Sequence, residues 1–345
     1  MTWKRKPQVG DWVEVRSKEE ILRTLDADGK LDGMPFMPEM LAFCGQRLKV
    51  YKRAHKTCDT VFPVRARRVA DAIHLDTRCD GSGHDGCQAG CLLFWKLAWL
   101  KPAGAPQSGA ESSALAGGLT EIDLWSRTRD SATGDGSPRY VCQATQLPYA
   151  STNLDWWEVT QYVEDYTSGN VGWGRILSGA IYMAALWLSR AGVGMGRPIR
   201  WFWDNFYFLW AGSPYPRRGG TVPDGEPTPV ANLNLVPGEL VQIKPYPEIL
   251  KTLNEGNRNR GLYWDAEEVP YCGKTYRVLR RVDRIVNERT GEMQIMKTPC
   301  VILDSVICES RYSECRLFCP RSIYPYWREI WLERVDPTRS GEPAE

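Results

Sequence analysis

The sequence predicts a mainly β chain with a helical insert, of the α+β class. Segments in which apolar and polar residues alternate recur near both ends of the chain, as is typical of half-buried strands. Residues 10–53 also align with residues 238–281 without a gap, at a constant offset of 228. An apolar, aromatic-rich stretch lies between the two copies. We therefore predict two duplicated small β-barrel modules that flank a helical segment.

Each copy begins with a short predicted strand. GDWVEVRS (10–17) and GELVQIKP (238–245) alternate apolar and polar residues after a turn glycine. In the first copy, Ser17 and Glu20 have the spacing of a capping box, which predicts a short helix directly after Ser17. Two further alternating segments follow in each copy, QRLKVYKRA and RRVADAIHLD in the first, KTYRVLRRV and TPCVILDSV in the second. This pattern favours a strongly bent, five-stranded barrel in each copy.

The repeat and the composition of the connecting segments divide the chain into domains. Residues 102–119 are rich in Pro, Gly, Ser and Ala, which predicts a flexible linker. The predicted order is an N-terminal module (1–101), this linker, a helical aromatic-rich insert (120–211), a second linker (212–235), a C-terminal module (236–335) and a disordered tail (336–345).

The overall composition predicts a folded, water-soluble protein. Charged residues make up 25% of the 345 residues, and the formal net charge is only +2, so there is no strong nucleic-acid signal. The basic start MTWKRKPQVGDW has no apolar stretch behind it, which predicts that no secretory signal is present. We therefore expect a cytoplasmic protein whose eleven cysteines are reduced.

The segment RCDGSGHDGCQAGC (78–91) carries the strongest functional signal. It gathers thiols and an imidazole among glycines, which let a short loop curl around one point. Thiolates and imidazole are the ligands of zinc and of iron–sulfur clusters. Cysteines gather again in the second copy. We predict the metal ligands to be Cys58, Cys79, His84, Cys87 and Cys91 in the first copy and Cys300, Cys308, Cys315 and Cys319 in the second.

The identity of the metal stays open between two alternatives, and thiols that merely pack in the core are a third explanation. Four nitrogen or sulfur ligands satisfy a closed zinc site. An iron–sulfur cluster gains from glycine N–H groups and an apolar shell, such as that offered by Phe94 and Trp95. We expect an iron–sulfur cluster, with zinc as the alternative.

Three short motifs resemble known families. Cys-Asp-Gly-Ser at 79–82, followed by His84, resembles the CDGSH iron–sulfur family, in which the matching Cys and His bind the cluster. This chain has one more residue before the histidine and lacks the family's upstream Cys-x-Cys pair. The whole chain resembles an uncharacterised bacterial family marked by RCDGxxHxGCxxxC…FWK, which implies no known activity. The opening GDxVEV strand is similar to that of SH3-like modules, and this resemblance implies two SH3-like barrels.

These features predict a metal-binding protein that acts as a redox or metallo-catalytic component of a bacterial biosynthetic pathway. The alternatives are a non-enzymatic, zinc-stabilised interaction or scaffold module and a membrane-peripheral accessory protein. We expect the partner to be another protein. Residues 176–210 combine an uncharged run, too short to span a bilayer, with WFWDNFYFLW. They predict either a buried core helix or a helix that contacts a membrane surface or docks onto a partner.

The remaining two histidines carry weaker signals. His74 and Asp76 have the His-x-Asp spacing of some iron sites, although a half-exposed strand histidine is the expected explanation. His55 follows Lys52 and Arg53 and precedes Lys56, so we expect it at the solvated surface.

Overall fold

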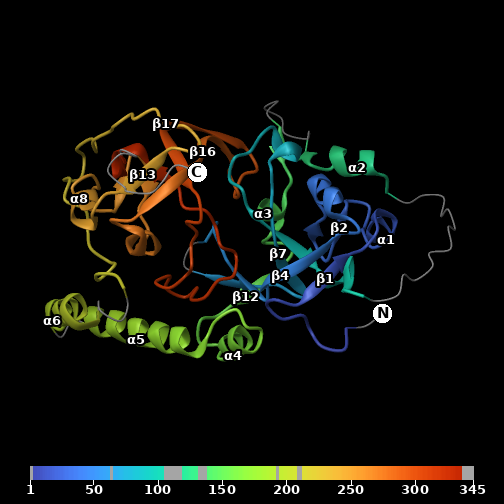
Figure 1. Cartoon of the computed structure of the whole chain (residues 1–345), viewed down its shortest axis with the longest axis horizontal. Helices are drawn as coiled ribbons and strands as arrows, with labels where there is room; N and C mark the ends of the chain where they lie inside the picture. The colour runs from blue at the N-terminus through green and yellow to red at the C-terminus, as the bar shows by residue number, and fades with distance from the viewer. Residues whose placement is uncertain are drawn as a thin grey trace, which may run out of the picture. The chain divides into compact units, whose positions relative to one another are not determined.

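The computed structural model divides the chain into two compact units (Figure 1). Unit 1 contains Met1–Trp173, Arg284–Gln294 and Phe318–Ser322, and unit 2 contains Gly174–Asp283, Ile295–Leu317 and Ile323–Glu345. The structure describes residues 3–62, 65–104, 119–130, 138–191, 194–207 and 212–335. Most of the predicted linker (105–118) and the predicted tail (336–345) lie outside the described residues. The predicted helical insert is divided between the two units at Trp173.

Unit 1 is built on a sheet of five antiparallel strands. Their spatial order is β8 (Leu92–Lys96), β7 (Ala72–Arg78), β4 (Arg47–Arg53), β1 (Trp12–Val15) and β9 (Leu100–Pro102). In β1, Val13 and Val15 are fully buried while Trp12 is exposed, as the alternation predicts. The sheet therefore turns one face toward a core that also contains Trp95 and Trp99.

Short elements surround this sheet. They are α1 (Lys18–Leu22), β2 (Lys30–Leu31), β3 (Met34–Pro35), η1 (Pro38–Phe43), β5 (Lys56–Cys58), β6 (Ala66–Arg68), η2 (Ser82–His84), η3 (Leu97–Trp99), α2 (Glu121–Ser126), β10 (Arg129–Asp130), β11 (Arg139–Tyr140), α3 (Gln143–Gln146), β12 (Thr152–Leu154) and α4 (Thr160–Thr167). The capping box of α1 is confirmed. The backbone N–H of Glu20 donates to Ser17 Oγ at 3.2 Å, and the Ser17 N–H donates to Glu20 Oε2 at 3.0 Å.

Unit 2 contains a second five-stranded sheet with the order β18 (Trp327–Arg328), β17 (Met293–Leu303), β16 (Thr275–Val286), β13 (Leu240–Ile243) and β19 (Leu332–Arg334). The six residues that connect β16 to β17 (287–292) are grouped with unit 1, together with the adjoining strand ends. The other elements are α5 (Trp173–Arg190), α6 (Gly196–Phe202), η4 (Trp203–Tyr207), α8 (Tyr246–Leu250), β14 (Arg258–Asn259), β15 (Leu262–Tyr263), η5 (Ala266–Tyr271) and η6 (Glu329–Trp331).

The two sheets share more than their strand order. The short elements recur at the offset found in the sequence, so that η1 corresponds to η5 and α1 to α8. A buried tryptophan also makes the same hydrogen bond in both. The indole of Trp99 donates to Thr24 Oγ1 at 3.1 Å, and that of Trp331 donates to Thr252 Oγ1 at 2.9 Å. Positions related by the sequence repeat therefore make equivalent contacts.

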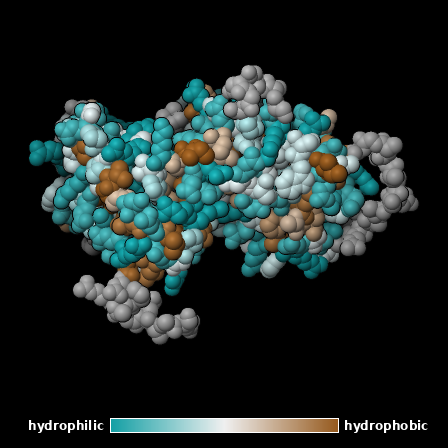
Figure 2. Space-filling model, turned by 90° about the horizontal axis from the view of Figure 1, so that it is seen from above, coloured by the Kyte–Doolittle hydropathy of each residue, from teal (hydrophilic) through white to brown (hydrophobic). Residues whose placement is uncertain are grey.

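The predicted combination of antiparallel sheets and helices is present, and the sheets are curled, with a half-barrel. Helix content, at about 26%, nearly equals the strand content of about 27%, so the chain is of a mixed class rather than mainly β. The SH3-like identity of the sheets stays a prediction. The face shown in Figure 2 is mostly hydrophilic, with hydrophobic residues gathered in limited patches. In the described part of the chain, no helix has both the length and the apolar character needed to cross a bilayer.

Candidate metal site

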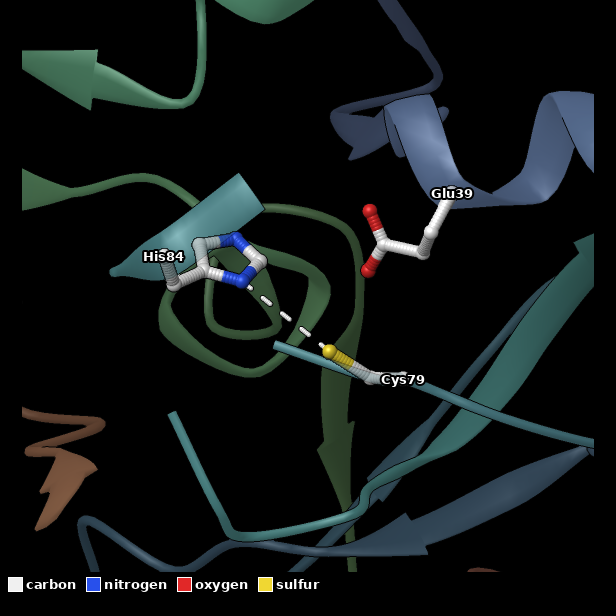
Figure 3. Close-up of side chains that lie close together, drawn as sticks. All are labelled: Glu39, Cys79 and His84. Carbon is white, nitrogen blue, oxygen red and sulfur yellow. Dashed lines mark hydrogen bonds between the residues drawn. The ribbon is translucent and has the colours of Figure 1, made fainter. Parts of the chain in front are cut away.

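Three side chains that could bind one metal ion come together in unit 1 (Figure 3). Glu39 lies in η1, Cys79 directly follows β7, and His84 ends η2. Their ligand atoms all lie within 4.8 Å of one another, and Cys79 Sγ is 3.9 Å from His84 Nδ1. Two ligands of one tetrahedral zinc ion stand about 3.5 Å apart at the usual bond lengths. The arrangement therefore needs little contraction to bind an ion.

The loop that carries two of these side chains depends on Gly81. This residue has a φ of +81°, a backbone conformation that glycine adopts readily. Its carbonyl accepts the N–H of His84 and of Gly86, each at 3.0 Å, which curls the loop back on itself. A Cβ atom at this position would lie 2.1 Å from the carbonyl oxygen of Cys87. Only glycine fits here, and the tight turn directs His84 toward Cys79.

A backbone hydrogen bond joins the residue after β7 to the residue before β8. The N–H of Cys79 donates to the carbonyl of Cys91 at 2.8 Å, so both ends of the glycine-rich segment are joined. Gly83 brings the loop close to η1, because a Cβ there would lie 3.5 Å from Glu39 Oε2. The backbone of Gly83 therefore lies next to the Glu39 carboxylate.

The Glu39 carboxylate is in an unfavourable environment. Both of its oxygens are buried, and neither has a hydrogen-bond partner among the described residues. Removing a carboxylate from water without a hydrogen-bond donor or a cation beside it is unfavourable. Within the described structure, Cys79 and His84 are the side chains that could bind one metal ion together with Glu39, and Glu39 forms no ion pair there. The site therefore lacks positive charge.

Burial also changes the protonation of the other two groups. It raises the pKa of the Cys79 thiol far above its usual value, and the charge of Glu39 adds to that effect. Burial lowers the pKa of His84 below 6.5, while the Glu39 charge and the Val141 backbone oppose this shift. At neutral pH the protein alone therefore holds a protonated thiol and a neutral imidazole.

The glutamate of the second copy that corresponds to Glu39 has hydrogen-bond donors around its carboxylate. Glu267, which aligns with Glu39, is buried, and its carboxylate has several hydrogen-bond donors. It accepts the backbone N–H of Arg311 at 2.8 Å, the N–H of Tyr312 and the hydroxyl of Ser313 at 3.0 Å. The missing donors at Glu39 are therefore a property of the first copy and not of the fold position.

The other predicted ligands of the first copy do not join this group. Among the described residues, Glu39, Cys79 and His84 form the only set of three such ligands that meet. Cys87 Sγ accepts the backbone N–H of Val286 at 3.3 Å. The Cys91 thiol has a pKa raised to about 12 by burial. These two thiols lie in the same loop but outside the group of three.

The remaining predicted ligands are divided between the units. Cys58 and Cys319 are buried in unit 1, where the Cys58 N–H donates to Cys319 Sγ at 3.0 Å. Cys300, Cys308 and Cys315 belong to unit 2. Glu39 was missed as a ligand from the sequence, although the repeat pairs it with Glu267 and could have drawn attention to it.

The two other histidines are both buried, contrary to what the sequence suggested. His74 is fully buried, its Nδ1 lies 2.9 Å from the Leu93 carbonyl, and burial lowers its pKa to about 3. His55 is 5% exposed because α4 covers it, and its Nε2 lies 3.3 Å from Asp165 Oδ1. Alternation along a strand could not reveal that a helix from the insert covers this end of the module.

Replacing Gly81 with Ala should disrupt the site, because the new Cβ atom meets backbone that cannot move freely. Gly86→Ala is the matched control, since Gly86 also has a positive φ, of +75°, but open space around its Cα atom. We expect Gly81→Ala to lower the free energy of unfolding by at least about 2 kcal/mol more than Gly86→Ala, measured by urea denaturation. Equal losses for both variants would contradict the packing described here.

Comparison of the chain with protein-family models, with curated proteins and with solved structures found no match. The candidate site is therefore defined by its own geometry, namely a carboxylate, a thiol and an imidazole within 4.8 Å of one another.

Proposed function

We propose that this protein binds one zinc ion through Glu39, Cys79 and His84. The observation that carries this proposal is the Glu39 carboxylate, whose two buried oxygens have no nitrogen or hydroxyl donor and no ion pair among the described residues and lie beside a thiol and an imidazole. A divalent cation would supply the missing positive charge. It would also bind the thiolate, because metal ions deprotonate the thiols that they bind.

A nucleophilic role for Cys79 is less well supported. A reactive thiol needs a lowered pKa, which comes from nearby positive charge. Here burial and the Glu39 carboxylate act in the opposite direction and raise the pKa of Cys79. The same three residue types therefore suit a metal site better than a cysteine–histidine catalytic pair.

The mixture of ligands supports zinc over an iron–sulfur cluster, the metal centre expected from the sequence. Zinc binds combinations of thiolate, imidazole and carboxylate in one tetrahedral site, whereas clusters are held mainly by thiolates. Glu39 and His84 together outnumber the single thiol of the group. An iron–sulfur cluster that recruits Cys87 and Cys91 is the alternative that the experiment below distinguishes.

Burial favours a structural role for the ion, in a non-enzymatic, zinc-stabilised interaction module. His84 is 1% exposed and both Glu39 oxygens are buried, so an ion here would join η1 to the end of β7 and to η2. A metallo-catalytic role has one observation in its favour. The group offers only three protein ligands, and catalytic zinc sites keep a fourth position for water.

We further propose that the two sheets arose by duplication of one SH3-like module. The common strand order and the equivalent Trp–Thr hydrogen bonds support a duplication. The curled, five-stranded form of the sheets supports the SH3-like description.

Metal analysis of the purified protein and four variants tests the proposal. We expect about one zinc ion per chain, and we expect Glu39→Gln and Cys79→Ser to weaken zinc binding by more than about 100-fold, because each removes a direct ligand. Glu267→Gln is the matched control and should retain zinc, as should Cys91→Ser. Iron with acid-labile sulfide, lost in Cys91→Ser, would instead establish the cluster, and a metal-free wild-type protein would rule out both.

The pH dependence of zinc affinity follows from the two pKa shifts. Between pH 7 and pH 8.5 the metal-free site holds a neutral imidazole, since the pKa of His84 is lowered, and a protonated thiol, since that of Cys79 is raised. Binding should then release about one thiol proton, so the logarithm of affinity should rise by about one per pH unit. Competition with a chelator of known pH dependence measures this slope. A flat profile would mean that no thiol proton is displaced.

A further inference from the structure

The outer side of α5 carries a stripe of exposed apolar side chains. Leu177, Ala184, Trp187 and Leu188 are exposed and recur at the spacing of one helix face. The opposite side of the helix is the one that packs in unit 2, where Tyr182 and Leu186 are buried against Trp203. The prediction of a buried core helix therefore fits only half of this helix.

The next helix, α6, has no buried residue at all. Met195, Trp201 and Phe202 are each between 42% and 61% exposed, which is unusual for side chains of this size. A cavity of about 540 Å³ between α5 and α6 is lined entirely by apolar residues, among them Ile181, Leu188 and Ile199. The two helices, which follow each other along the chain in Figure 1, thus present a joint apolar surface. We call the exposed apolar residues Leu177, Trp187, Leu188, Met195, Trp201 and Phe202 the α5–α6 surface.

The charged residues of α5 and α6 themselves are all basic. Residues 173–203 contain four arginines and no acidic residue. Arg175 and Arg190 form ion pairs with Glu309 and Glu314 of the same unit. Arg197 and Arg200 are exposed on α6 and have no ion pair in the described part of the chain. An apolar face bordered by unpaired arginines is complementary to a negatively charged, partly apolar boundary.

We infer that the α5–α6 surface binds the surface of an anionic lipid bilayer. Tryptophan and phenylalanine favour the boundary between headgroups and acyl chains, and arginine contributes attraction to anionic lipid. No described helix is suited to cross the bilayer, so α5 and α6 would lie in the plane of the interface. Residues 208–210, which end the segment that the sequence singled out, lie outside the described residues. This inference is independent of the metal site, whose residues belong to unit 1.

Vesicle flotation of the full chain tests this inference. We expect binding to vesicles of phosphatidylcholine mixed with phosphatidylglycerol, and at least about 10-fold weaker binding to phosphatidylcholine alone or at high salt. Trp201→Ser with Phe202→Ser, and separately Arg197→Glu with Arg200→Glu, should each reduce binding to the mixed vesicles by at least about 10-fold. Circular dichroism and zinc content check that each variant remains folded.

Matched controls use exposed residues that are not part of the α5–α6 surface. Trp157→Ser removes an equally exposed tryptophan, and Arg277→Glu with Arg289→Glu makes the same change in charge. Both controls should bind the mixed vesicles as the wild type does. Failure of the wild type to float with either kind of vesicle would overturn the inference, as would equal losses in the controls. Self-association that is lost in Trp201→Ser with Phe202→Ser, without vesicle binding, would identify the surface as a protein interface instead.

Discussion

The local structure around the glycine-rich segment depends on how one buried carboxylate is compensated. Glu39 lies beside the loop that contains Gly81 and Gly83. Its two carboxylate oxygens have no hydrogen-bond partner among the described residues. Leaving a charge buried and unpaired is among the most costly arrangements in a folded protein. A bound cation removes that cost and at the same time stabilises the thiolate and uses the lone pair of a neutral imidazole. One bound ion would therefore interact favourably with the Glu39 carboxylate, the Cys79 thiolate and the His84 imidazole at the same time.

Glu39 and Glu267 occupy equivalent positions of the sequence repeat but have different surroundings. The first and second units place a glutamate with a buried carboxylate at equivalent positions of η1 and η5. In the second copy, the backbone of residues 311 and 312 and the Ser313 hydroxyl surround Glu267 with donors. In the first copy, a thiol and an imidazole stand near Glu39 instead. Under the proposed function, the two units would satisfy this carboxylate by different chemistry, hydrogen bonds at Glu267 and a metal ion at Glu39.

The sequence predicted local features better than those that depend on tertiary contacts. The capping box at Ser17 and the buried alternation of β1 rest on neighbouring residues and are present. The meeting of Cys79 with His84 was also expected, because both lie in one short loop. Glu39 lies 40 residues earlier in the chain, and only the fold of η1 against the loop brings it near. His55 is buried by α4, which no pattern within the module could indicate.

X-ray absorption at the zinc edge of the zinc-loaded protein tests most directly whether Glu39, Cys79 and His84 bind one zinc ion. We expect one sulfur ligand at about 2.3 Å and nitrogen or oxygen ligands at about 2.0–2.2 Å, one of them imidazole. Glu39→Gln should change the nitrogen and oxygen shell and leave the sulfur shell unaltered. A first shell of three or four sulfur atoms would contradict the account, because it would mean that Cys79 shares the ion with thiols that this structure places outside the group.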